Sequence, residues 1–327
     1  MKVGALVPAA SRLWSTRMKE LAERFPSVEV FMGEEATSRE FAGIEALVAS
    51  RLTTLQAEKA TSLKALFLPI TGINGIPAEL LARRGVRVFN VHSNAESVAE
   101  KALSMILAWF GRTIDYHNDL KEERWHGFWV GKGNEDEWDS IFDRRVAILG
   151  TGAIGSALAR LLKAFRCEVV GWRRREGLPV PPGFDRVETD LKAALRGRDI
   201  VVAALPLTSD TQNIVDASAF SEMGGAFFVN VGRGATVNEE ALWLALRDRV
   251  IAGAAIDVWY QYPEPGSTMG APSRFPIHEL PNVVLSPHVG GSTRQASRAA
   301  IEATCRNLSD WIERGEASDE VDLRSAY

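Results

Sequence analysis

The sequence predicts an α/β protein made of two units, each built on a parallel β-sheet. Three observations support this fold class. The chain has 327 residues, which is more than the roughly 100 to 200 that usually form one domain. Short apolar segments alternate with amphipathic helical segments, and a strand–helix–strand order produces parallel sheets with right-handed crossovers. This alternation begins at the N-terminus and begins again near Arg145.

Composition argues against several classes of protein. The formal net charge is −4 and the charged residues are dispersed, so we expect no nucleic-acid-binding surface. No apolar run approaches the roughly 18 residues that a membrane span needs, and the first residues do not resemble a signal peptide. The two cysteines, Cys167 and Cys305, are too few for a disulfide framework. We expect a soluble cytoplasmic protein.

The first unit contains short apolar segments that predict strands, separated by stretches typical of amphipathic helices. The expected strands are 3–8, 28–33, 46–50, 63–70 and 86–91, and the expected helices are 12–25 and 77–85. Residues 97–125 predict one long helix, and residues 126–138, rich in Gly, Trp and charge, predict a loop. A last amphipathic helix is expected within 292–315.

The second strand–helix series begins with a strand that leads into Gly150, Gly152 and Gly155. In this G-x-G-x-x-G spacing the first glycine permits a tight turn. The second lets a pyrophosphate approach the backbone, and the third allows helix and strand to pack closely. A helix beginning near Ala153 would direct its free N–H groups at the phosphates. Because the loop follows one strand, opens a helix and precedes another strand at 167–172, it predicts dinucleotide binding.

Three arginines follow the second strand of this unit. An acidic residue usually stands there and binds the adenosine ribose, but this chain has Arg173, Arg174 and Arg175. A carboxylate would repel a 2′-phosphate, whereas a guanidinium pairs with it through two hydrogen bonds. The alternative is a solvated basic turn. We predict NADP(H) as the preferred cofactor and NAD(H) as the second choice.

Three stretches further along occur in a fixed order: 204–215, 227–242, and 252–265 leading to 281–293. Together with the glycine loop, they closely resemble the D-2-hydroxyacid dehydrogenase family. That family includes glyoxylate and hydroxypyruvate reductases, phosphoglycerate dehydrogenase and NAD-dependent formate dehydrogenase.

The resemblance implies two doubly wound parallel-sheet domains with a cleft between them. Residues 1–98 and 289–327 would form a flavodoxin-like substrate domain. Residues 99–288 would form a Rossmann dinucleotide-binding domain. The resemblance also implies a homodimer, with the long helix after Ser97 and the Trp-rich loop at its interface. Four aromatic residues of that loop pack the interface or, alternatively, close a wall over the cleft: Trp125, Phe128, Trp129 and Trp138.

The resemblance implies catalytic roles for Arg233 and His288. By analogy, Arg233 binds the substrate carboxylate and polarises the carbonyl group. His288 would protonate the carbonyl oxygen as the hydride arrives, and would act as the base in the reverse direction. These residue types suit the chemistry, because arginine offers a planar fork that matches a carboxylate and histidine titrates near neutrality. Both residues follow strand-like apolar runs, and ligands bind at the carboxyl ends of strands in open α/β sheets.

Further contacts are implied in the same way. Asp257 would hold the nicotinamide carboxamide, and the loop at Thr71 would offer backbone N–H groups to the substrate carboxylate. The expected cofactor-binding residues are Gly150, Gly152, Ala153, Ile154, Gly155, Arg173, Arg174, Pro206, Thr211, Val231, Gly232, Arg233, Asp257 and His288. The expected substrate-binding residues are Thr71, Gly72, Ile73, Asn94 and Arg233.

One position departs from the family pattern. Most members carry a glutamate that hydrogen-bonds the catalytic histidine, and here that position is Tyr262. A carboxylate would raise the pKa of the imidazole, whereas a phenol carries no charge. We therefore expect Tyr262 to act as the catalytic partner that orients His288 without raising its pKa. Reduction should then decline at lower pH than in relatives with the glutamate. Glu264 is the alternative partner.

The remaining expectations concern substrate and metal. Residues 68–79 contain no arginine or lysine for a phosphate, so glyoxylate, hydroxypyruvate or pyruvate fit better than phosphoglycerate. Formate oxidation stays open, because formate dehydrogenases also lack the glutamate and share an asparagine resembling Asn94. A non-enzymatic, corepressor-like dinucleotide sensor is the other alternative. No pair of histidines has metal-ligand spacing, so we expect no metal, and His126 is expected in a loop without a partner.

Overall fold

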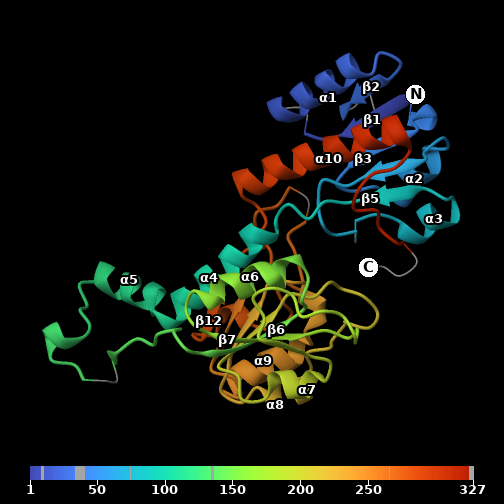
Figure 1. Ribbon diagram of the computed structural model, residues 1–327. Helices are drawn as coiled ribbons and strands as arrows, with labels where there is room; N and C mark the ends of the chain where they lie inside the picture. Colours follow the sequence, from blue (N-terminus) through green and yellow to red (C-terminus); the bar gives the residue numbers. More distant parts are fainter. Residues whose placement is uncertain (9–10, 34–40, 74, 134–135, 265, 324–327) are drawn as a thin grey trace. The chain divides into compact units, whose positions relative to one another are not determined.

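The computed structural model describes residues 1–327 except 9–10, 34–40, 74, 134–135, 265 and 324–327. Two compact units divide the chain (Figure 1). One unit comprises residues 1–94 and 292–327, and the other comprises residues 95–291. Each unit contains one sheet whose pairings between strands are all parallel in the described chain. The predicted α/β class with two parallel sheets is confirmed.

The first unit has a five-stranded sheet in the order β2-β1-β3-β4-β5, which is the flavodoxin-like order. Its strands are β1 Lys2–Leu6, β2 Glu29–Met32, β3 Ala46–Ala49, β4 Ala65–Phe67 and β5 Arg87–Phe89. Its helices are α1 Arg12–Arg24, α2 Thr54–Lys59, α3 Ala78–Arg83 and α10 Arg294–Arg314, with a 3-10 turn at Phe41–Gly43. Side chains of α1 and α10 share a buried cluster on one face of the sheet, and those of α2 and α3 share another. This sheet is therefore doubly wound.

The second unit has a seven-stranded sheet in the order β12-β11-β10-β9-β6-β7-β8. Its strands are β6 Arg145–Leu149, β7 Glu168–Trp172, β8 Arg186–Glu188, β9 Ile200–Ala203, β10 Phe227–Asn230, β11 Gly253–Ile256 and β12 Val283–Leu285. Its helices are α4 Ala95–Phe110, α5 Thr113–Lys121, α6 Ala153–Lys163, α7 Leu191–Leu195, α8 Ala217–Glu222 and α9 Glu239–Arg247, with 3-10 turns at Phe128–Val130, Gly234–Thr236 and Ile277–Glu279. Numbered from β6, the first six strands follow the Rossmann order 3-2-1-4-5-6.

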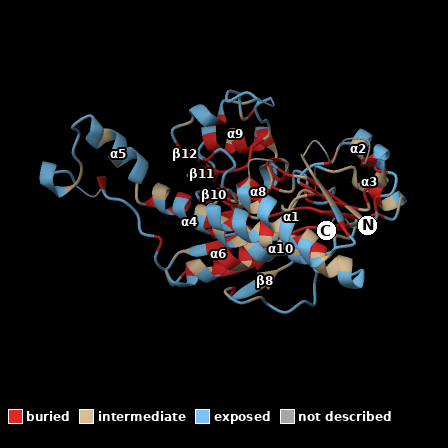
Figure 2. Ribbon diagram, turned by 90° about the horizontal axis from the view of Figure 1, so that it is seen from above, coloured by how far each residue is buried: buried red, intermediate tan, exposed pale blue. Residues whose placement is uncertain are grey.

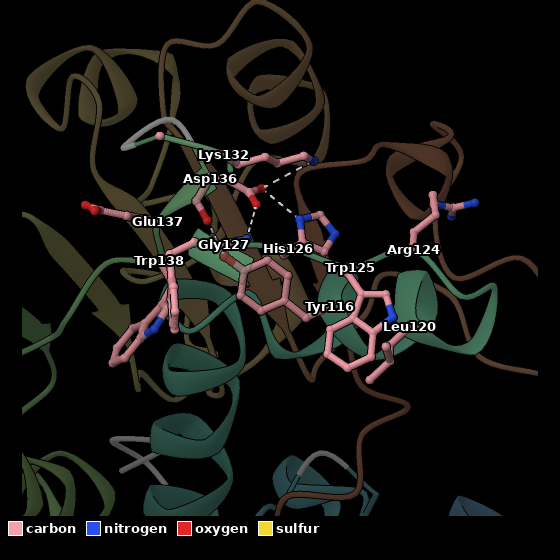
Figure 3. A pocket seen from close by; sticks show the side chains of 12 residues that line it. Tyr116, Leu120, Arg124, Trp125, His126, Gly127, Lys132, Asp136, Glu137 and Trp138 are labelled. Atoms are coloured by element: carbon pink, nitrogen blue, oxygen red, sulfur yellow. Dashed lines mark hydrogen bonds and ion pairs between the residues drawn. The ribbon is translucent and has the colours of Figure 1, made fainter. Parts of the chain in front are cut away.

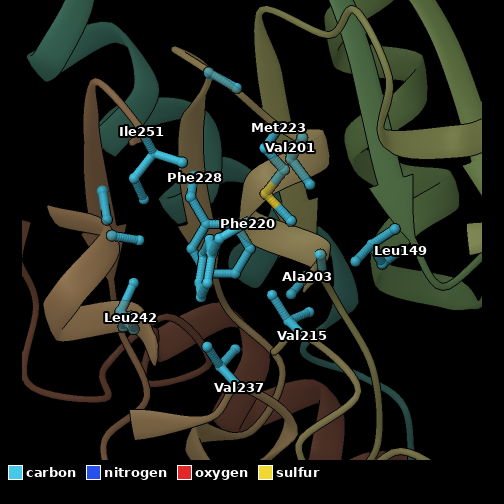
Figure 4. Close-up of a cluster of buried hydrophobic side chains, with 14 of the residues drawn as sticks. Leu149, Val201, Ala203, Val215, Phe220, Met223, Phe228, Val237, Leu242 and Ile251 are labelled. Carbon is cyan, nitrogen blue, oxygen red and sulfur yellow. The ribbon is translucent and has the colours of Figure 1, made fainter. Parts of the chain in front are cut away.

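Two buried clusters cover the faces of the second sheet. One joins the sheet to α4 and α6, and the other joins it to α7, α8 and α9. Figure 4 shows Phe220 of α8 beside Phe228 of β10 in the latter cluster, where the two rings meet edge to face with centroids 5.4 Å apart. Both side chains are fully buried, so replacing Phe228 by alanine would cost about 3–5 kcal/mol of unfolding free energy. This core packs against the strands of the sheet. Figure 2 colours the buried residues red.

The long helix expected over 97–125 is two helices, so that prediction was wrong. Helix α4 ends at Phe110, where the N–H of Gly111 donates to the Leu107 carbonyl at 2.9 Å. Arg112 then adopts a left-handed conformation with φ 48° before α5 begins. A left-handed residue cannot continue an α-helix. The apolar periodicity continues across the break and conceals it in the sequence.

Candidate active site

The residues expected to bind the cofactor lie at one edge of the second sheet. Because the sheet is parallel, the carboxyl ends of its strands share that edge. Gly150 follows β6, Arg173 follows β7, Pro206 lies beyond β9, Arg233 follows β10, Asp257 follows β11, and His288 follows β12. The chain order reverses at β6, which pairs with both β7 and β9. Ligands of open α/β sheets bind at such a switch point.

The glycine loop forms a cradle that fits a pyrophosphate. Gly150 has φ +105°, and a Cβ on it would lie 2.7 Å from the Ala204 carbonyl oxygen. A Cβ on Gly155 would lie 2.0 Å from the Gly150 carbonyl oxygen, so α6 and the loop pack without room for a side chain. A Cβ on Gly152 would have no other atom within 4 Å. Gly152 is also the N-cap of α6. The first N–H groups of α6 therefore face open space, where a phosphate would be bound by them and by the helix dipole.

The three arginines after β7 have different surroundings. Arg173 turns back onto its own loop, where Nη1 donates to the Pro179 carbonyl at 3.0 Å and Nη2 donates to the Leu178 carbonyl. Arg174 forms an ion pair with Asp210, and both side chains are about half exposed. Arg175 is exposed. This edge thus offers two exposed guanidiniums, one of them already paired with a carboxylate.

Two loops beside the glycine cradle are fixed by short contacts. Thr211 is buried, and its hydroxyl donates to the Pro206 carbonyl at 2.6 Å. A Cβ on Gly232 would lie 2.5 Å from the Leu205 carbonyl oxygen, so the loop after β10 packs directly against the loop after β9. The structure therefore brings Pro206, Thr211 and Gly232 together, and Val231 beside them is buried.

Arg233 has a rigid backbone. Its carbonyl accepts hydrogen bonds from Asn230 Nδ2 at 3.2 Å and from Thr236 Oγ1 at 2.7 Å. Both of these residues are buried. The guanidinium Nη1 donates to the Gly232 carbonyl at 2.8 Å, which uses one of five N–H donors. The side chain thus keeps most of its hydrogen-bonding capacity for an anion such as a carboxylate.

Asp257 holds the loop that carries His288. One carboxylate oxygen accepts from the Ser286 hydroxyl at 2.5 Å and from the Val289 N–H at 3.0 Å, and the other accepts from the Gly290 N–H at 2.9 Å. Asp257 is 2% exposed, and three donors satisfy its buried charge. His288 lies between Ser286 and Val289, two of the residues that bind Asp257. Its φ is 58°, a left-handed conformation that few residues other than glycine adopt.

Tyr262 is the partner of the His288 ring. The phenolic oxygen lies 2.7 Å from His288 Nδ1 and accepts a hydrogen bond from the Trp259 N–H at 3.1 Å. Trp259 is fixed in turn, because its indole Nε1 donates to the Ser286 carbonyl at 2.8 Å. The two rings are tilted at 45° with centroids 5.4 Å apart. The phenol therefore occupies Nδ1 of His288. Glu264, the alternative partner expected from the sequence, is exposed.

Both members of this pair have shifted pKa values. The pKa of His288 is lowered, chiefly because its surroundings shield the imidazolium from water and also because Arg233 is positive; Asp257 opposes the shift. The pKa of Tyr262 is raised, chiefly by the same shielding, while the Trp259 N–H and Arg233 oppose the shift. At neutral pH the ground state is therefore a neutral imidazole beside a neutral phenol.

The first unit contains the residues expected to bind the substrate. Thr71 and Asn94 lie together, with 3.0 Å between Thr71 Oγ1 and Asn94 Oδ1. Asn90 Nδ2 donates to the Thr71 carbonyl at 2.7 Å, which fixes the loop. The side chain of Ile73 is buried in the core of this unit, so Gly72 and Ile73 could contribute only through their backbone.

The segment after α4, residues 113–138 and here called the arm, carries the exposed aromatic residues. Figure 1 draws α5 and the loop after it away from the sheet of their unit. Trp125, Phe128, Trp129 and Trp138 are all more than half exposed. Figure 3 shows a pocket in the arm where Tyr116 and Trp125 lie near His126, and Trp138 is another of its lining residues.

His126 has two partners in the arm, so the expectation that it has none was wrong. Its Nδ1 lies 2.7 Å from Asp136 Oδ1, and its Nε2 lies 2.8 Å from Asp119 Oδ2. The pKa of His126 is raised, first by Asp136 and then by Asp119. The loop pattern of the sequence gave no indication that residues 119 and 136 would converge.

Several functional candidates of the second unit were not identified from the sequence. Trp259 and Ser286 fix Tyr262 and the His288 loop, and Asp210 pairs with Arg174. The order of strands could have suggested Ser286, because β11 and β12 are neighbours and their ends meet. In the described part of the chain, no group of three His, Cys, Asp or Glu residues is placed to hold a metal ion. No described helix has the length and apolar character that crossing a membrane requires.

Comparisons with known proteins show relatives of this chain in sequence and in fold. Residues 103–290 match the family model described as D-isomer specific 2-hydroxyacid dehydrogenase, NAD binding domain. A glyoxylate/hydroxypyruvate reductase A of Arabidopsis thaliana is 31% identical over 271 residues, covering 82% of this chain and 78% of the relative. A glyoxylate/hydroxypyruvate reductase B of Citrobacter koseri is 29% identical and covers 85% of each chain. The crystal structure of an NADPH-dependent glyoxylate/hydroxypyruvate reductase from Sinorhizobium meliloti has a TM-score of 0.79 at 26% identity, with 98% of each chain covered.

Proposed function

Because the chain belongs to the D-isomer specific 2-hydroxyacid dehydrogenase family, we propose that it reduces small 2-keto acids with NADPH as the preferred cofactor. Family membership makes the protein an oxidoreductase that uses a nicotinamide dinucleotide. The substrate, the preference for NADPH and the catalytic residues are our proposal. The relatives named glyoxylate/hydroxypyruvate reductases support a small 2-keto acid as the substrate.

The observation that carries the proposal is the fixed His288–Tyr262 pair beside the charge of Arg233. The bound cofactor supplies a hydride to the carbonyl carbon. Arg233 would bind the substrate carboxylate and draw electron density from the carbonyl, and His288 would deliver a proton to the carbonyl oxygen. Asp257 keeps the His288 loop in place. Thr71, Gly72, Ile73 and Asn94 stay proposed substrate contacts of the first unit.

The preference for NADPH is supported by the arginines after β7. Arg174 and Arg175 are exposed and can turn toward a 2′-phosphate, while Arg173 supports the loop beneath them. Each hydrogen bond to a charged group contributes about 1.5–3 kcal/mol. Losing one such contact should therefore weaken NADPH binding by at least about tenfold.

A rate assay tests the function. NADPH and NADH are each followed with glyoxylate, hydroxypyruvate, pyruvate and a bulky phenyl-substituted keto acid. We expect faster consumption of NADPH, and we expect Arg174→Ala to lose that advantage while NADH rates stay unchanged. Arg298→Ala, an exposed change on α10, is the matched control. Equal rates with both cofactors would overturn the preference, and turnover only of formate with NAD(P)+ would favour the formate dehydrogenase alternative.

We also propose that the arm binds a second copy of the chain, forming a homodimer. Several large aromatic side chains exposed on one short segment are unusual on a monomer and typical of an interface. Phe128 and Trp129 are 75% and 77% exposed, and their rings lie in contact with centroids 4.6 Å apart. Light scattering should give a dimer for the wild type and a monomer for Trp129→Asp. Leu55→Asp, at an apolar residue exposed on α2, should stay dimeric.

A further inference from the structure

The donors and acceptors around Tyr262 define the direction of its hydrogen bond to His288. A phenolic oxygen has one proton and two lone pairs. The Trp259 N–H can only donate, so at 3.1 Å it occupies one lone pair. Among the described residues, His288 Nδ1 is the other hydrogen-bonding neighbour of this oxygen, and it can accept the phenolic proton.

The length of the contact supports the same direction. At 2.7 Å it matches an O–H donor, whose bonds are typically about 2.7–2.8 Å, better than an N–H donor, whose bonds are about 2.9–3.0 Å. Phenol is also the stronger acid and a neutral imidazole nitrogen the stronger base. A neutral imidazole that accepts at Nδ1 carries its proton on Nε2.

We propose that Tyr262 locks neutral His288 as the Nε2–H tautomer and gives His288 a proton as His288 protonates the substrate. This inference rests on the proposed reduction of a keto acid. As the hydride forms the new C–H bond, the Nε2 proton passes to the carbonyl oxygen. Nδ1 takes the phenolic proton, so the imidazole stays neutral and Tyr262 becomes a phenolate. The starting state returns when Nε2 takes a proton from water, which reaches it because His288 is exposed, and Nδ1 gives its proton back to the phenolate.

The surroundings suit such a relay. Burial raises the pKa of Tyr262, and the Trp259 N–H and the positive charge of Arg233 oppose that shift. The alkoxide that accepts the first proton is a much stronger base than a phenolate, so it can drive the transfer. The relay needs no imidazolium, whose formation the same surroundings disfavour. It therefore changes the pH dependence expected from the sequence, because reduction would no longer follow protonation of His288.

Two measurements test the relay. The first is the ¹⁵N NMR spectrum of histidine-labelled protein without substrate, in which His288→Gln assigns one of the five histidines. We expect the Nε2–H tautomer in the wild type and loss of that bias in Tyr262→Phe. An Nδ1–H tautomer in the wild type would overturn the proposal. This readout does not depend on turnover, so it separates the relay from the proposed function, which fails if no keto acid is reduced.

The second measurement is the pH profile of kcat for reduction. Wild-type kcat should stay level through the pH range in which imidazoles ordinarily titrate, around pH 6.5. It should fall only at alkaline pH. Tyr262→Phe should need the imidazolium, which the surroundings disfavour by lowering the pKa of His288. It should lose at least about 30-fold by pH 8, because only about one in 30 unshifted imidazoles, of pKa about 6.5, is protonated there. The control is Tyr260→Phe, which removes a buried hydroxyl that has no hydrogen-bond partner among the described residues, and it should match the wild type. A wild-type kcat that falls together with that of Tyr262→Phe would leave Tyr262 an orienting role alone.

Discussion

Arg174 and Asp210 form an ion pair that joins the segment after β7 to the loop after β9. The pair sets a carboxylate beside the guanidinium that we assign to the 2′-phosphate. A bound phosphate would have to share Arg174 with Asp210 and would be repelled by it.

Replacing Asp210 by asparagine should therefore strengthen NADPH binding. The change removes one negative charge and frees Arg174, and both partners are about half exposed, so solvent limits the effect. We expect the Kd for NADPH to fall about 2- to 5-fold and the Kd for NADH to stay the same, as measured by calorimetry. A parallel change in both values would mean that Asp210 acts on the loop and not on the phosphate.

The glycine cradle gives a matched pair of variants. Gly155→Ala would place a Cβ 2.0 Å from the Gly150 carbonyl oxygen, so it should cost about 1–3 kcal/mol of unfolding free energy. Gly152→Ala meets nothing within 4 Å and has φ −75°, so Tm should change little. We nevertheless expect Gly152→Ala to weaken dinucleotide binding by tenfold or more, because the methyl group would occupy the space of the pyrophosphate. Normal affinity in Gly152→Ala would contradict the assignment of the cradle.

Ser286→Ala tests whether Asp257 positions His288. The substitution removes the 2.5 Å hydrogen bond to a buried carboxylate, which should cost about 1.5–3 kcal/mol of unfolding free energy. It should also loosen the left-handed backbone at His288 and lower kcat more than it raises KM. Ser221→Ala, at an exposed hydroxyl on α8, serves as the control. An unchanged kcat would show that the loop holds His288 without Ser286.

The arm should become less stable as pH rises. His126 has a raised pKa in the folded arm because of Asp136 and Asp119, so its stabilising contribution is complete below its ordinary value of 6.5. That contribution is lost as pH rises through the folded value. Arg124 also faces Asp119, and Arg112 and Lys132 face Asp136. The hydrogen-exchange protection factors of the arm, which are corrected for the intrinsic rise of the exchange rate with pH, should therefore fall between acid and mildly alkaline pH. His126→Gln should abolish this dependence, and His117→Gln on α5 should keep it.

The sequence predicted the parts of the fold that local patterns determine. The strands of the first sheet, the strands β6, β7, β10 and β12 of the second and the glycine loop were predicted, because apolar runs and glycine spacing are read within a few residues. The break at Gly111 and Arg112 was missed, since an apolar face continues on both sides of it. The bonds from Asp257 to Ser286 and Val289 join residues about thirty positions apart. Such contacts depend on which strands become neighbours, which the local sequence does not determine.

The order of strands also places the residues for cofactor choice and those for proton delivery at different positions along the sheet. Arg173 follows β7 and His288 follows β12, five strand intervals away. At about 4.8 Å per interval this is about 24 Å. Residues this far apart without shared partners contribute independently to free energies. Cofactor choice and proton delivery should therefore be separable properties, so that a variant engineered for NADH would keep the pH profile of its parent.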